Sequence, residues 1–320
     1  MLKPEILVTD RFIPLVLDGL RTAFTTHNLW EAQDIETFLQ SVSERIRGVA
    51  CGHTIPFDRS LIDRFPQVEI IANFGVGYDN IDAAYAATKN IVVTNTPDVL
   101  TEEVADTAIG LMIMAARELS AAERWLRAGN WSKPYPLSRG TLRGKRLGVF
   151  GLGRIGRAIA RRAEAMQMEI GYFNRNPVAE VSYRYFPTLA ELARGSDVLM
   201  CAAPGGEDTR HIINAGIFSA LGPDGIFVNI GRGSTVDEAA LIEALKNRTI
   251  MSAGLDVFEF EPNVPAELIA LDHVVLLPHV GSASRHTRNA MGQLQVDNLR
   301  QWFDKGEPIT PVAETPWPRT

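Results

Sequence analysis

The chain has 320 residues, of which 46% are hydrophobic and 22% are charged, and its formal net charge is −6. This composition indicates a globular protein that is long enough for two domains, each with its own hydrophobic core. The negative net charge and the lack of any basic tract argue against nucleic acid or an anionic membrane as a partner.

The N-terminal part of the chain repeats a pattern in which a short apolar strand is followed by a helix. The predicted strands cover residues 5–9, 48–51, 68–72 and 91–94, and the predicted helices cover residues 14–26, 59–65 and 82–87. Apolar β-branched runs that alternate with helices are typical of a small parallel α/β sheet.

A long helix is predicted next, from Thr101 to Gly129. Its apolar residues lie nearly all round the helix, which is typical of a helix that packs between domains or subunits. Residues 132–140 then form an arm that is interrupted by prolines and carries the aromatic side chain of Tyr135, directly after Trp131. Both a dimer contact and an ordinary surface loop agree with such an arm.

A second strand–helix pattern begins at Leu142. Its strands are predicted at residues 146–150, 169–173, 197–201, 225–230, 251–257 and 273–277, and a last helix at residues 288–304 returns to the first domain. The proline-rich tail, residues 311–320, is predicted to be loose. We therefore expect an α/β protein of two doubly wound parallel-sheet domains, in which a Rossmann cofactor domain (99–285) is inserted into a flavodoxin-like substrate domain (1–98 and 286–320).

A glycine-rich motif, Gly151-Leu152-Gly153-Arg154-Ile155-Gly156, joins an apolar strand to a helix. In this setting the pattern predicts a binding site for the pyrophosphate of a dinucleotide. Gly151 permits the tight turn, Gly153 lets the backbone approach the pyrophosphate, and Gly156 lets helix and strand pack closely. The N–H groups at the start of the helix then face an anion. A purely structural turn is the alternative, which the flanking strand and helix disfavour.

The end of the following strand indicates which dinucleotide is bound. In an NAD site, a carboxylate about 20 residues beyond the glycines accepts hydrogen bonds from the adenosine ribose. Here the strand ends in Asn174-Arg175-Asn176 instead. Two amides and a guanidinium suit a 2′-phosphate, which they would hold by charge-assisted hydrogen bonds. The sequence therefore predicts an NADP(H) site.

Ionisable residues follow three later strands of the predicted sheet. Arg232 stands between two glycines, where its planar fork can bind a carboxylate. Asp256 ends one strand and Glu261 follows it, while His279 lies just beyond the last strand. A nearby carboxylate keeps an imidazole protonated, so we expect His279 to act as a general acid with Glu261 as its partner. We expect Arg232 to bind the substrate.

Each of these residues also has a structural interpretation. A single histidine beside a strand is more often a hydrogen-bonded structural residue, Arg232 could form a surface ion pair, and Asp256 or Glu261 could cap a turn. The catalytic interpretation is favoured because the residues occur together at strand ends of a dinucleotide fold. The remaining histidines do not occur together with such residues. No pair of them has metal-ligand spacing with a cysteine or an acid, so no metal is expected. These are His27, His53, His211, His273 and His286.

The expected compartment is cytoplasmic. Cys51 and Cys201 both lie in apolar runs and are expected to be reduced core thiols. The N-terminal residues lead directly into a strand, without the pattern of a signal peptide. The longest apolar stretch, within residues 109–116, is far shorter than the roughly 20 residues that span a bilayer.

Over nearly its full length the chain resembles the D-isomer-specific 2-hydroxyacid dehydrogenases. The resemblance is carried by four motifs: Gly151 to Gly156; Ile230-Gly231-Arg232-Gly233 with Val236-Asp237; Ala253 to Phe258 with Glu261-Pro262; and Pro278-His279-Val280-Gly281-Ser282.

The resemblance implies roles for these residues. It makes His279 the acid/base, Glu261 its partner and Arg232 the residue that holds the substrate. It places Asp256 at the nicotinamide carboxamide and the backbone of Val76 and Gly77, within the Phe74–Gly77 loop, at the substrate carboxylate. It also implies a homodimer built on the long helix and two domains that close over a cleft. The implied cofactor contacts are Gly151, Gly153, Arg154, Ile155, Gly156, Asn174, Arg175, Asn176, Ala203, Pro204, Thr209, Ile230, Arg232, Asp256, His279 and Gly281.

Within the family, Asn174-Arg175-Asn176 makes the chain most similar to the NADPH-dependent glyoxylate/hydroxypyruvate reductases and their 2-ketogluconate-reducing relatives. We expect reduction of a small 2-oxo acid such as glyoxylate or hydroxypyruvate. A reductase of 2-ketogluconate or of another 2-oxo acid is the first alternative, and a non-catalytic nucleotide-sensing dimer is the second. Formate oxidation is disfavoured because an acid–imidazole pair serves proton transfer, which that reaction does not need.

Overall fold

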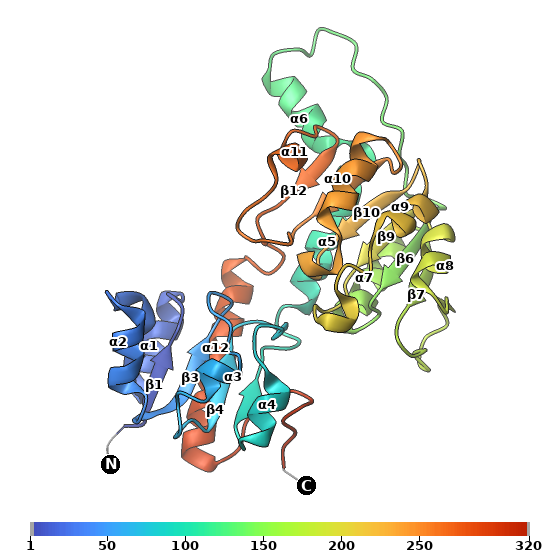
Figure 1. Cartoon of the computed structure of the whole chain (residues 1–320). Coiled ribbons are helices and arrows are strands. Elements are labelled where there is room, and N and C mark those ends of the chain that lie inside the picture. Colours follow the sequence, from blue (N-terminus) through green and yellow to red (C-terminus); the bar gives the residue numbers. More distant parts are fainter. Residues whose placement is uncertain (1–2, 319–320) are drawn as a thin grey trace. The chain divides into compact units, whose positions relative to one another are not determined.

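The computed structural model describes residues 3–318, which divide into two compact units. Unit 1 consists of Met1–Leu100 and Ser284–Thr320, and unit 2 consists of Thr101–Ala283. Each unit is an α/β layer structure around a parallel sheet (Figure 1). The prediction of two parallel-sheet α/β domains is confirmed.

Unit 1 is built on five strands in the order β2-β1-β3-β4-β5, all parallel. This is the flavodoxin-like order, in which β1 and β3 flank the point where the chain reverses direction across the sheet. The strands are β1 (Glu5–Val8), β2 (Thr25–Asn28), β3 (Ile46–Cys51), β4 (Ile70–Asn73) and β5 (Val92–Thr94).

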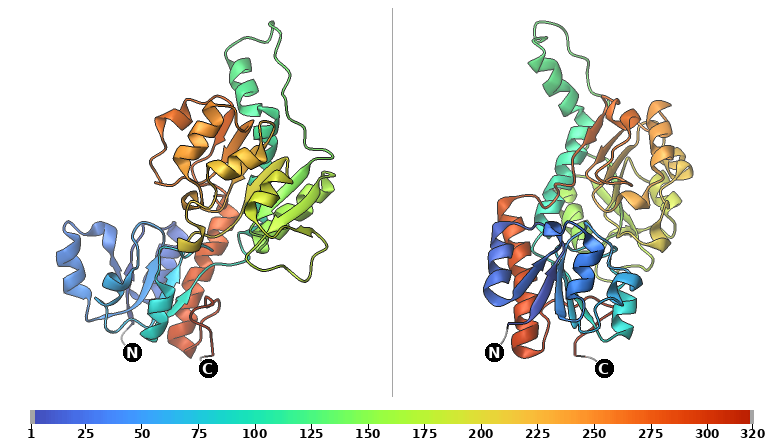
Figure 2. Two further views of the ribbon diagram at one scale, coloured as in Figure 1. Left: turned by 45° about the vertical axis from the view of Figure 1, so that its right-hand side comes forward. Right: turned by 60° about the vertical axis from the view of Figure 1, so that its left-hand side comes forward.

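Helices cover both faces of this sheet (Figure 2). On one face α1 (Pro14–Ala23) packs beside α12 (Arg285–Lys305), and a Cβ at Gly48 of β3 would lie only 3.1 Å from Phe303 and 3.3 Å from Leu299 of α12. The other face carries a buried apolar cluster that includes Leu7, Val49 and Ile71 from the strands. The helices over that cluster are α2 (Ile35–Val42), α3 (Arg59–Ile62) and α4 (Ala83–Thr88).

One expected helix boundary in unit 1 is wrong, and one strand and one helix there have no counterpart in the expected pattern. The helix predicted to reach residue 26 ends at Ala23, because Phe24 turns to an extended conformation and Thr25–Asn28 pairs with β1 as an edge strand. The helix α2 was not predicted at all. Its amphipathic pattern is short, and the side chain of Asp34 caps it by accepting a hydrogen bond from the Thr37 N–H at 2.9 Å.

The C-terminal tail is also more ordered than predicted. The Val312 N–H donates to the carbonyl of Val93 at 2.9 Å, and the buried Thr315 hydroxyl bonds the backbone of the same residue. Trp317 packs edge to face on Trp302 of α12. Up to residue 318 the tail is therefore packed on β5 and α12, while the last two residues of the predicted loose segment, 319 and 320, lie outside the described residues.

Unit 2 is built on seven parallel strands in the order β12-β11-β10-β9-β6-β7-β8. This is the Rossmann order, with an added edge strand at the β12 end. The strands are β6 (Arg146–Phe150), β7 (Glu169–Phe173), β8 (Arg184–Tyr185), β9 (Val198–Cys201), β10 (Ile226–Asn229), β11 (Ser252–Leu255) and β12 (Val274–Leu276).

Helices flank the sheet of unit 2 on both faces. One face buries a large apolar cluster under α8 (Leu189–Arg194), α9 (Ala215–Leu221) and α10 (Glu238–Lys246). On the other face lie α5 (Thr101–Arg117) and α7 (Arg154–Ala165), where the Ser252 hydroxyl donates to the carbonyl of Ala115 at 3.2 Å. A short helix, α11 (Ala266–Ile269), precedes β12.

The long helix predicted from Thr101 to Gly129 is interrupted. It consists of α5 and α6 (Leu119–Arg127), separated by Glu118, whose φ of 53° is left-handed. Since that conformation cannot continue a helix, the chain changes direction there. Figure 1 shows α6 and the irregular segment after it extending away from the sheet of unit 2. Trp131 and Leu137 on that segment are 78% and 95% exposed.

Two further observations concern the whole described chain. Cys51 and Cys201 are both buried and free of disulfides, as predicted. None of the helices within residues 3–318 is long and apolar enough to cross a bilayer.

Candidate active site

The glycine-rich turn joins β6 to α7 in unit 2. Gly151 has a φ of +96°, and a Cβ there would lie 2.6 Å from the backbone N of Ala203. A Cβ on Gly156 would collide with the Gly151 carbonyl oxygen, whereas a Cβ on Gly153 would meet only open space. The first and third glycines are therefore needed for packing, and the second leaves the backbone accessible to a ligand.

The first turn of α7 offers hydrogen-bond donors to that ligand. Gly153 is the N-cap and has no side chain with which to satisfy the N–H groups of the first turn. Arg154 and Ile155 are the first helical residues. A twelve-residue helix that begins without a side-chain cap at an open glycine is suited to bind a phosphate group.

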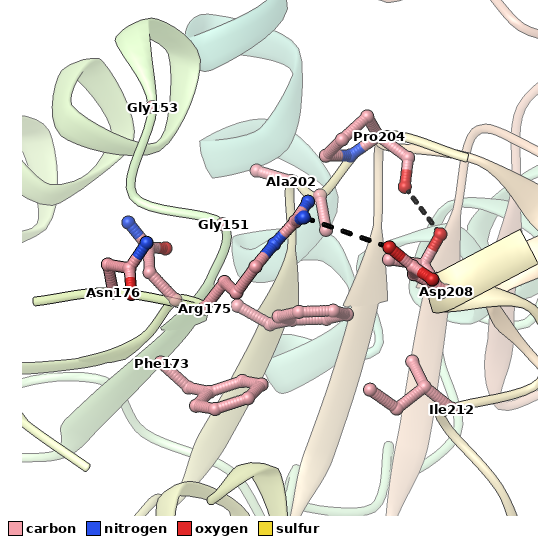
Figure 3. A pocket seen from close by; sticks show the side chains of 13 residues that line it. Gly151, Gly153, Phe173, Arg175, Asn176, Ala202, Pro204, Asp208 and Ile212 are labelled. Carbon is pink, nitrogen blue, oxygen red and sulfur yellow. Dashed lines mark hydrogen bonds and ion pairs between the residues drawn. The ribbon is translucent and has the colours of Figure 1, made fainter. Parts of the chain in front are cut away.

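A cavity of about 630 Å³ opens beside this turn (Figure 3). It combines apolar walls with a few polar groups, which is typical of a nucleotide site. Eight of the predicted cofactor contacts line it: Gly151, Gly153, Asn174, Arg175, Asn176, Ala203, Pro204 and Thr209. The other lining residues are Phe150, Phe173, Ala202, Asp208 and Ile212.

The three polar residues after β7 lie at this cavity. The Oδ1 atom of Asn174 accepts a hydrogen bond from the Leu152 N–H in the glycine-rich turn at 2.7 Å, which leaves Nδ2 to donate to a ligand. The Arg175 guanidinium is 85% exposed and lies 3.7 Å from the Asp208 carboxylate. Figure 3 shows Arg175 pointing across the cavity toward Asp208, with Asn176 on the side of the glycine-rich turn.

The opposite wall of the cavity comes from the segment after β9. Thr209 donates its hydroxyl hydrogen to the carbonyl of Pro204 at 2.9 Å and so closes the loop between them. A Cβ on Gly231, the residue after Ile230, would lie 2.5 Å from the Ala203 carbonyl oxygen. The Ala203–Pro204 wall and the turn before Arg232 are therefore in close backbone contact.

His279 and Glu261 form a hydrogen-bonded pair. The His279 Nδ1 atom lies 2.8 Å from Glu261 Oε2, and the two side chains are 41% and 36% exposed. The other oxygen of Glu261 accepts from the Phe258 N–H at 3.1 Å. Burial raises the pKa of Glu261. This rise is outweighed by the hydrogen bond and charge of His279, the Phe258 N–H and the charge of Arg232, so the pKa of Glu261 lies below its ordinary value.

Asp256 fixes the loop that carries His279. Its two carboxylate oxygens accept from the N–H groups of Val280 and Gly281 at 2.7 and 2.8 Å. The His279 N–H in turn donates to the Asp256 carbonyl at 2.9 Å, and His279 has a left-handed φ of 53°. Asp256 is 2% exposed; burial raises its pKa, and the two backbone donors and His279 offset only part of that rise.

Arg232 lies on a tightly packed turn. The Asn229 side chain accepts from the Gly231 N–H and donates to the Arg232 carbonyl, both at 3.0 Å. A Cβ on the next residue, Gly233, would collide with the carbonyl group of Phe258. The turn with Arg232 therefore packs directly against the segment that leads to Glu261.

The two predicted substrate residues, Val76 and Gly77, belong to unit 1. The Asn73 side chain donates to the carbonyls of Gly75 and Gly77 at 3.2 and 2.8 Å, and the Asn95 side chain donates to the carbonyl of Val76 at 2.8 Å. The carbonyls of Gly75, Val76 and Gly77 therefore all point toward the side-chain amides of Asn73 and Asn95. In a planar trans peptide the N–H points opposite to the carbonyl, so the N–H groups of Val76 and Gly77 point away from these side chains.

Three polar contacts, two of them beside the nucleotide cavity and one in unit 1, have no signal in the sequence. Asp208, which follows a glycine-rich stretch without any pattern of its own, lies beside Arg175. Two histidines for which the sequence indicates no partner are paired with carboxylates: His211 Nε2 lies 2.6 Å from Glu259, and, in unit 1, His27 Nε2 lies 2.7 Å from Glu5. Separations of 48 and 22 residues carry no local signal that would have revealed these pairs.

The chain is similar to known proteins over most of its length. Residues 109–281 match the family model of the D-isomer specific 2-hydroxyacid dehydrogenase NAD binding domain. A glyoxylate/hydroxypyruvate reductase A HPR2 of Arabidopsis thaliana is 45% identical over 92% of this chain and 94% of its own length. A 2-ketogluconate reductase of Gluconobacter oxydans is 39% identical over 97% and 99% of the two chains.

A solved structure is similar over the whole chain. The NADPH-dependent glyoxylate/hydroxypyruvate reductase of Sinorhizobium meliloti, in complex with NADP and malonate, is 52% identical, with a TM-score of 0.94 over 99% of both chains. Motifs, fold and comparisons agree, and the chain belongs to the D-isomer specific 2-hydroxyacid dehydrogenase family.

Proposed function

We propose that the protein is an NADPH-dependent reductase of small 2-oxo acids, with glyoxylate and hydroxypyruvate as preferred substrates. The observation that carries the proposal is the His279–Glu261 pair, with Nδ1 and Oε2 2.8 Å apart, in the same unit as a nucleotide cavity with Asn174, Arg175 and Asn176 in its lining. The names of the similar reductases support the substrate class and the cofactor. Unit 2 is then the cofactor domain and unit 1 the substrate domain.

The residues of the cavity fit NADP(H). The accessible Gly153 and the N–H groups at Arg154 and Ile155 suit the pyrophosphate. At the other end, Arg175 and the Nδ2 atom of Asn174 suit a 2′-phosphate, because a guanidinium binds phosphate oxygens by charge-assisted hydrogen bonds. We include Asn176, Ala203, Pro204, Thr209, Ile230 and Gly281 among the cofactor contacts.

The acid–base chemistry is assigned to His279. NADPH, when bound, supplies the hydride that reduces the 2-oxo carbon. The His279 imidazolium gives the proton to the carbonyl oxygen from Nε2, since Nδ1 is held by Glu261. The Glu261 carboxylate stabilises the imidazolium and fixes the ring orientation, and the Asp256 carboxylate fixes the backbone at Val280 and Gly281, directly after His279.

Arg232 and the Phe74–Gly77 loop bind the substrate in this proposal. The guanidinium of Arg232 holds the carboxylate and stabilises charge on the reacting oxygen. The outward N–H groups of Val76 and Gly77 offer a second set of donors to the carboxylate. For Asp256 a contact with the nicotinamide carboxamide adds to its bonds to Val280 and Gly281, because each carboxylate oxygen has a further lone pair.

We also propose a cytoplasmic homodimer. Leu126 of α6 and Trp131 and Leu137 of the following segment are 46%, 78% and 95% exposed. Large apolar side chains gathered on one projecting segment are typical of an interface. The family resemblance, which places a dimer contact on the long helix, agrees with α5 and α6 as its base.

Initial rates on glyoxylate, hydroxypyruvate, pyruvate and 2-ketogluconate, each with NADPH and with NADH, test the function. A clear NADPH preference with glyoxylate or hydroxypyruvate as the best substrate is the expected result. Highest kcat/KM on 2-ketogluconate would favour the activity of the Gluconobacter oxydans relative instead. Stoichiometric NADPH binding without turnover of any acid would contradict the enzyme assignment and favour a nucleotide sensor.

A further inference from the structure

A second histidine–carboxylate pair lies in unit 2, apart from His279 and Glu261. The Glu259 side chain is only 8% exposed. Its Oε1 atom accepts from His211 Nε2 at 2.6 Å and from the Arg210 guanidinium at 3.2 Å. A buried carboxylate is costly unless it is paired and hydrogen-bonded, so these contacts hold three side chains together.

The two partners of Glu259 belong to the rim of the nucleotide cavity. Arg210 and His211 directly follow the short 3-10 helix Glu207–Thr209 and stand between Thr209 and Ile212, which both line the cavity. The rim is attached to the turn after Arg232 as well, through the His211 N–H, which donates to the Ser234 carbonyl at 3.0 Å. A bond to His211 or Arg210 therefore acts on the cavity wall.

Glu259 itself belongs to the loop that positions Glu261. The preceding N–H, that of Phe258, donates to Glu261 Oε1 at 3.1 Å, and the N–H of Glu259 donates to Glu238 at 3.3 Å. The backbone between Phe258 and Glu259 is wedged against Gly233, where a Cβ would collide with the Glu259 N. A shift of Glu259 would therefore move the Phe258 N–H away from Glu261.

We propose that Glu259 is a positioning residue that couples the rim of the cofactor cavity to the loop that orients Glu261. The proposal rests on the proposed function and extends it. Through His211 and Arg210 the carboxylate holds the cavity wall, and through its own backbone it holds the donor to Glu261. One buried side chain thereby links cofactor binding to the orientation of Glu261 in the His279–Glu261 pair.

The experiment compares Glu259→Ala with Arg210→Gln and His211→Gln, and uses Glu267→Ala as the matched control. Glu267 is an exposed carboxylate on α11. The single-partner variants loosen only the rim and should raise the KM for NADPH several-fold with kcat retained. Glu259→Ala should raise that KM roughly tenfold and also lower kcat, because both attachments are lost. Glu267→Ala should match the wild type.

The acid side of the kcat–pH profile separates positioning from general stabilisation. The Phe258 N–H is one of the groups that lower the pKa of Glu261. The charged groups that act on Glu261, which are His279, Arg232 and Asp256, are the same in all variants. Loss of the Phe258 bond raises the pKa of Glu261, so the fall in kcat on acidification should begin at a higher pH in Glu259→Ala. In His211→Gln it should not move.

Glu259→Gln is the conservative variant for the case in which Glu259→Ala does not fold, because glutamine keeps the size of the side chain and an acceptor oxygen but removes the charge. It should fold and show a smaller change of the same kind. The proposal would be overturned if folded Glu259→Ala had the wild-type KM for NADPH and an unchanged acid side of the kcat–pH profile. It would also be overturned if His211→Gln shifted the acid side of that profile as much as Glu259→Ala does. If the wild type reduces no 2-oxo acid, the proposed function fails, while titration of each variant with NADPH by fluorescence still tests the link to the rim.

Discussion

The Oδ1 atom of Asn174 accepts a hydrogen bond from the Leu152 N–H at 2.7 Å, so the residue at the end of β7 is tied to the glycine-rich turn after β6. In the proposed cofactor site an aspartate could accept the same bond and would add a negative charge beside the adenosine ribose. Asparagine therefore keeps the geometry of the site while it removes the repulsion that a carboxylate would exert on a 2′-phosphate.

Replacement of Asn174 by aspartate should turn the cofactor preference toward NADH. The ratio of kcat/KM with NADPH to that with NADH should fall by at least about tenfold, or ~1.4 kcal/mol. Initial rates with both cofactors at a fixed saturating 2-oxo acid measure this. Asn174→Ala is the control, because it removes the bond to Leu152 and the Nδ2 donor without adding charge, and it should therefore lower the ratio less than Asn174→Asp does. An unchanged ratio in Asn174→Asp would exclude this residue from the 2′-phosphate site.

Arg175 and Asp208 should have opposite effects on NADPH. Arg175→Ala removes the proposed charge-assisted contact with the 2′-phosphate, about 1.5–3 kcal/mol, so the KM for NADPH should rise by roughly 10- to 100-fold. Asp208→Asn frees the guanidinium, which lies 3.7 Å from that carboxylate, and should lower the same KM a few-fold. Arg157→Ala, on α7 and paired with Glu180, is the control. A higher KM in Asp208→Asn would mean that Asp208 orients Arg175 instead of competing for it.

Removal of the imidazole at position 279 should abolish most turnover. His279→Ala should lower kcat by about 10²- to 10⁴-fold, the usual contribution of a general acid. Glu261→Gln should cause a smaller loss, because an amide still accepts a hydrogen bond from Nδ1 but does not stabilise the imidazolium. Fluorescence titration should show unchanged NADPH binding in Glu261→Gln. Near wild-type kcat in His279→Ala would refute the assignment.

The ion pair at the start of β6 should make stability depend on pH. The hydrogen bond from Arg146 to Asp197 lowers the pKa of that carboxyl by more than burial raises it, and the side chain of Asp197 is 26% exposed. A lowered folded-state pKa stabilises the protein above the unfolded pKa, and this contribution is lost as the pH falls through the folded value.

Asp197→Asn should therefore lower the free energy of unfolding by about 1–2 kcal/mol at pH 7, and the difference from wild type should shrink on acidification. Urea titrations followed by circular dichroism at pH 7 and pH 3 measure both values. Asp224→Asn, whose exposed pair with Arg139 contributes little, is the control. A constant difference at both pH values would show that hydrogen-bond geometry, and not charge, is what Asp197 supplies.

The projecting segment after α6 should carry the dimer contact. Leu137→Glu changes a side chain that is 95% exposed, so the fold of one chain should be unaffected. If Leu137 lies in an interface, the buried charge should convert the dimer to a monomer. Light scattering at several protein concentrations gives the mass, and the exposed Ile35→Glu on α2 serves as the control. A wild-type protein that is monomeric throughout would contradict the proposed dimer.

The sequence alone determined the features that depend on short-range patterns. The glycine spacing from Gly151 to Gly156 predicts the dinucleotide turn because backbone geometry at each glycine is a local property. Apolar β-branched runs predict parallel strands because strands buried on both faces need a continuous apolar sequence. Asn174-Arg175-Asn176 could be recognised because it follows the second strand of that pattern.

The tertiary structure decided what depends on residues far apart in the chain. The break at Glu118 and the edge strand Thr25–Asn28 follow from packing and pairing that propensity does not encode. The tail packs on β5 because distant backbone groups at Val93 are available to it. The pairs Arg175–Asp208 and His211–Glu259 likewise form only once separate loops meet at the end of the sheet, since no local pattern fixes which side chains come together there.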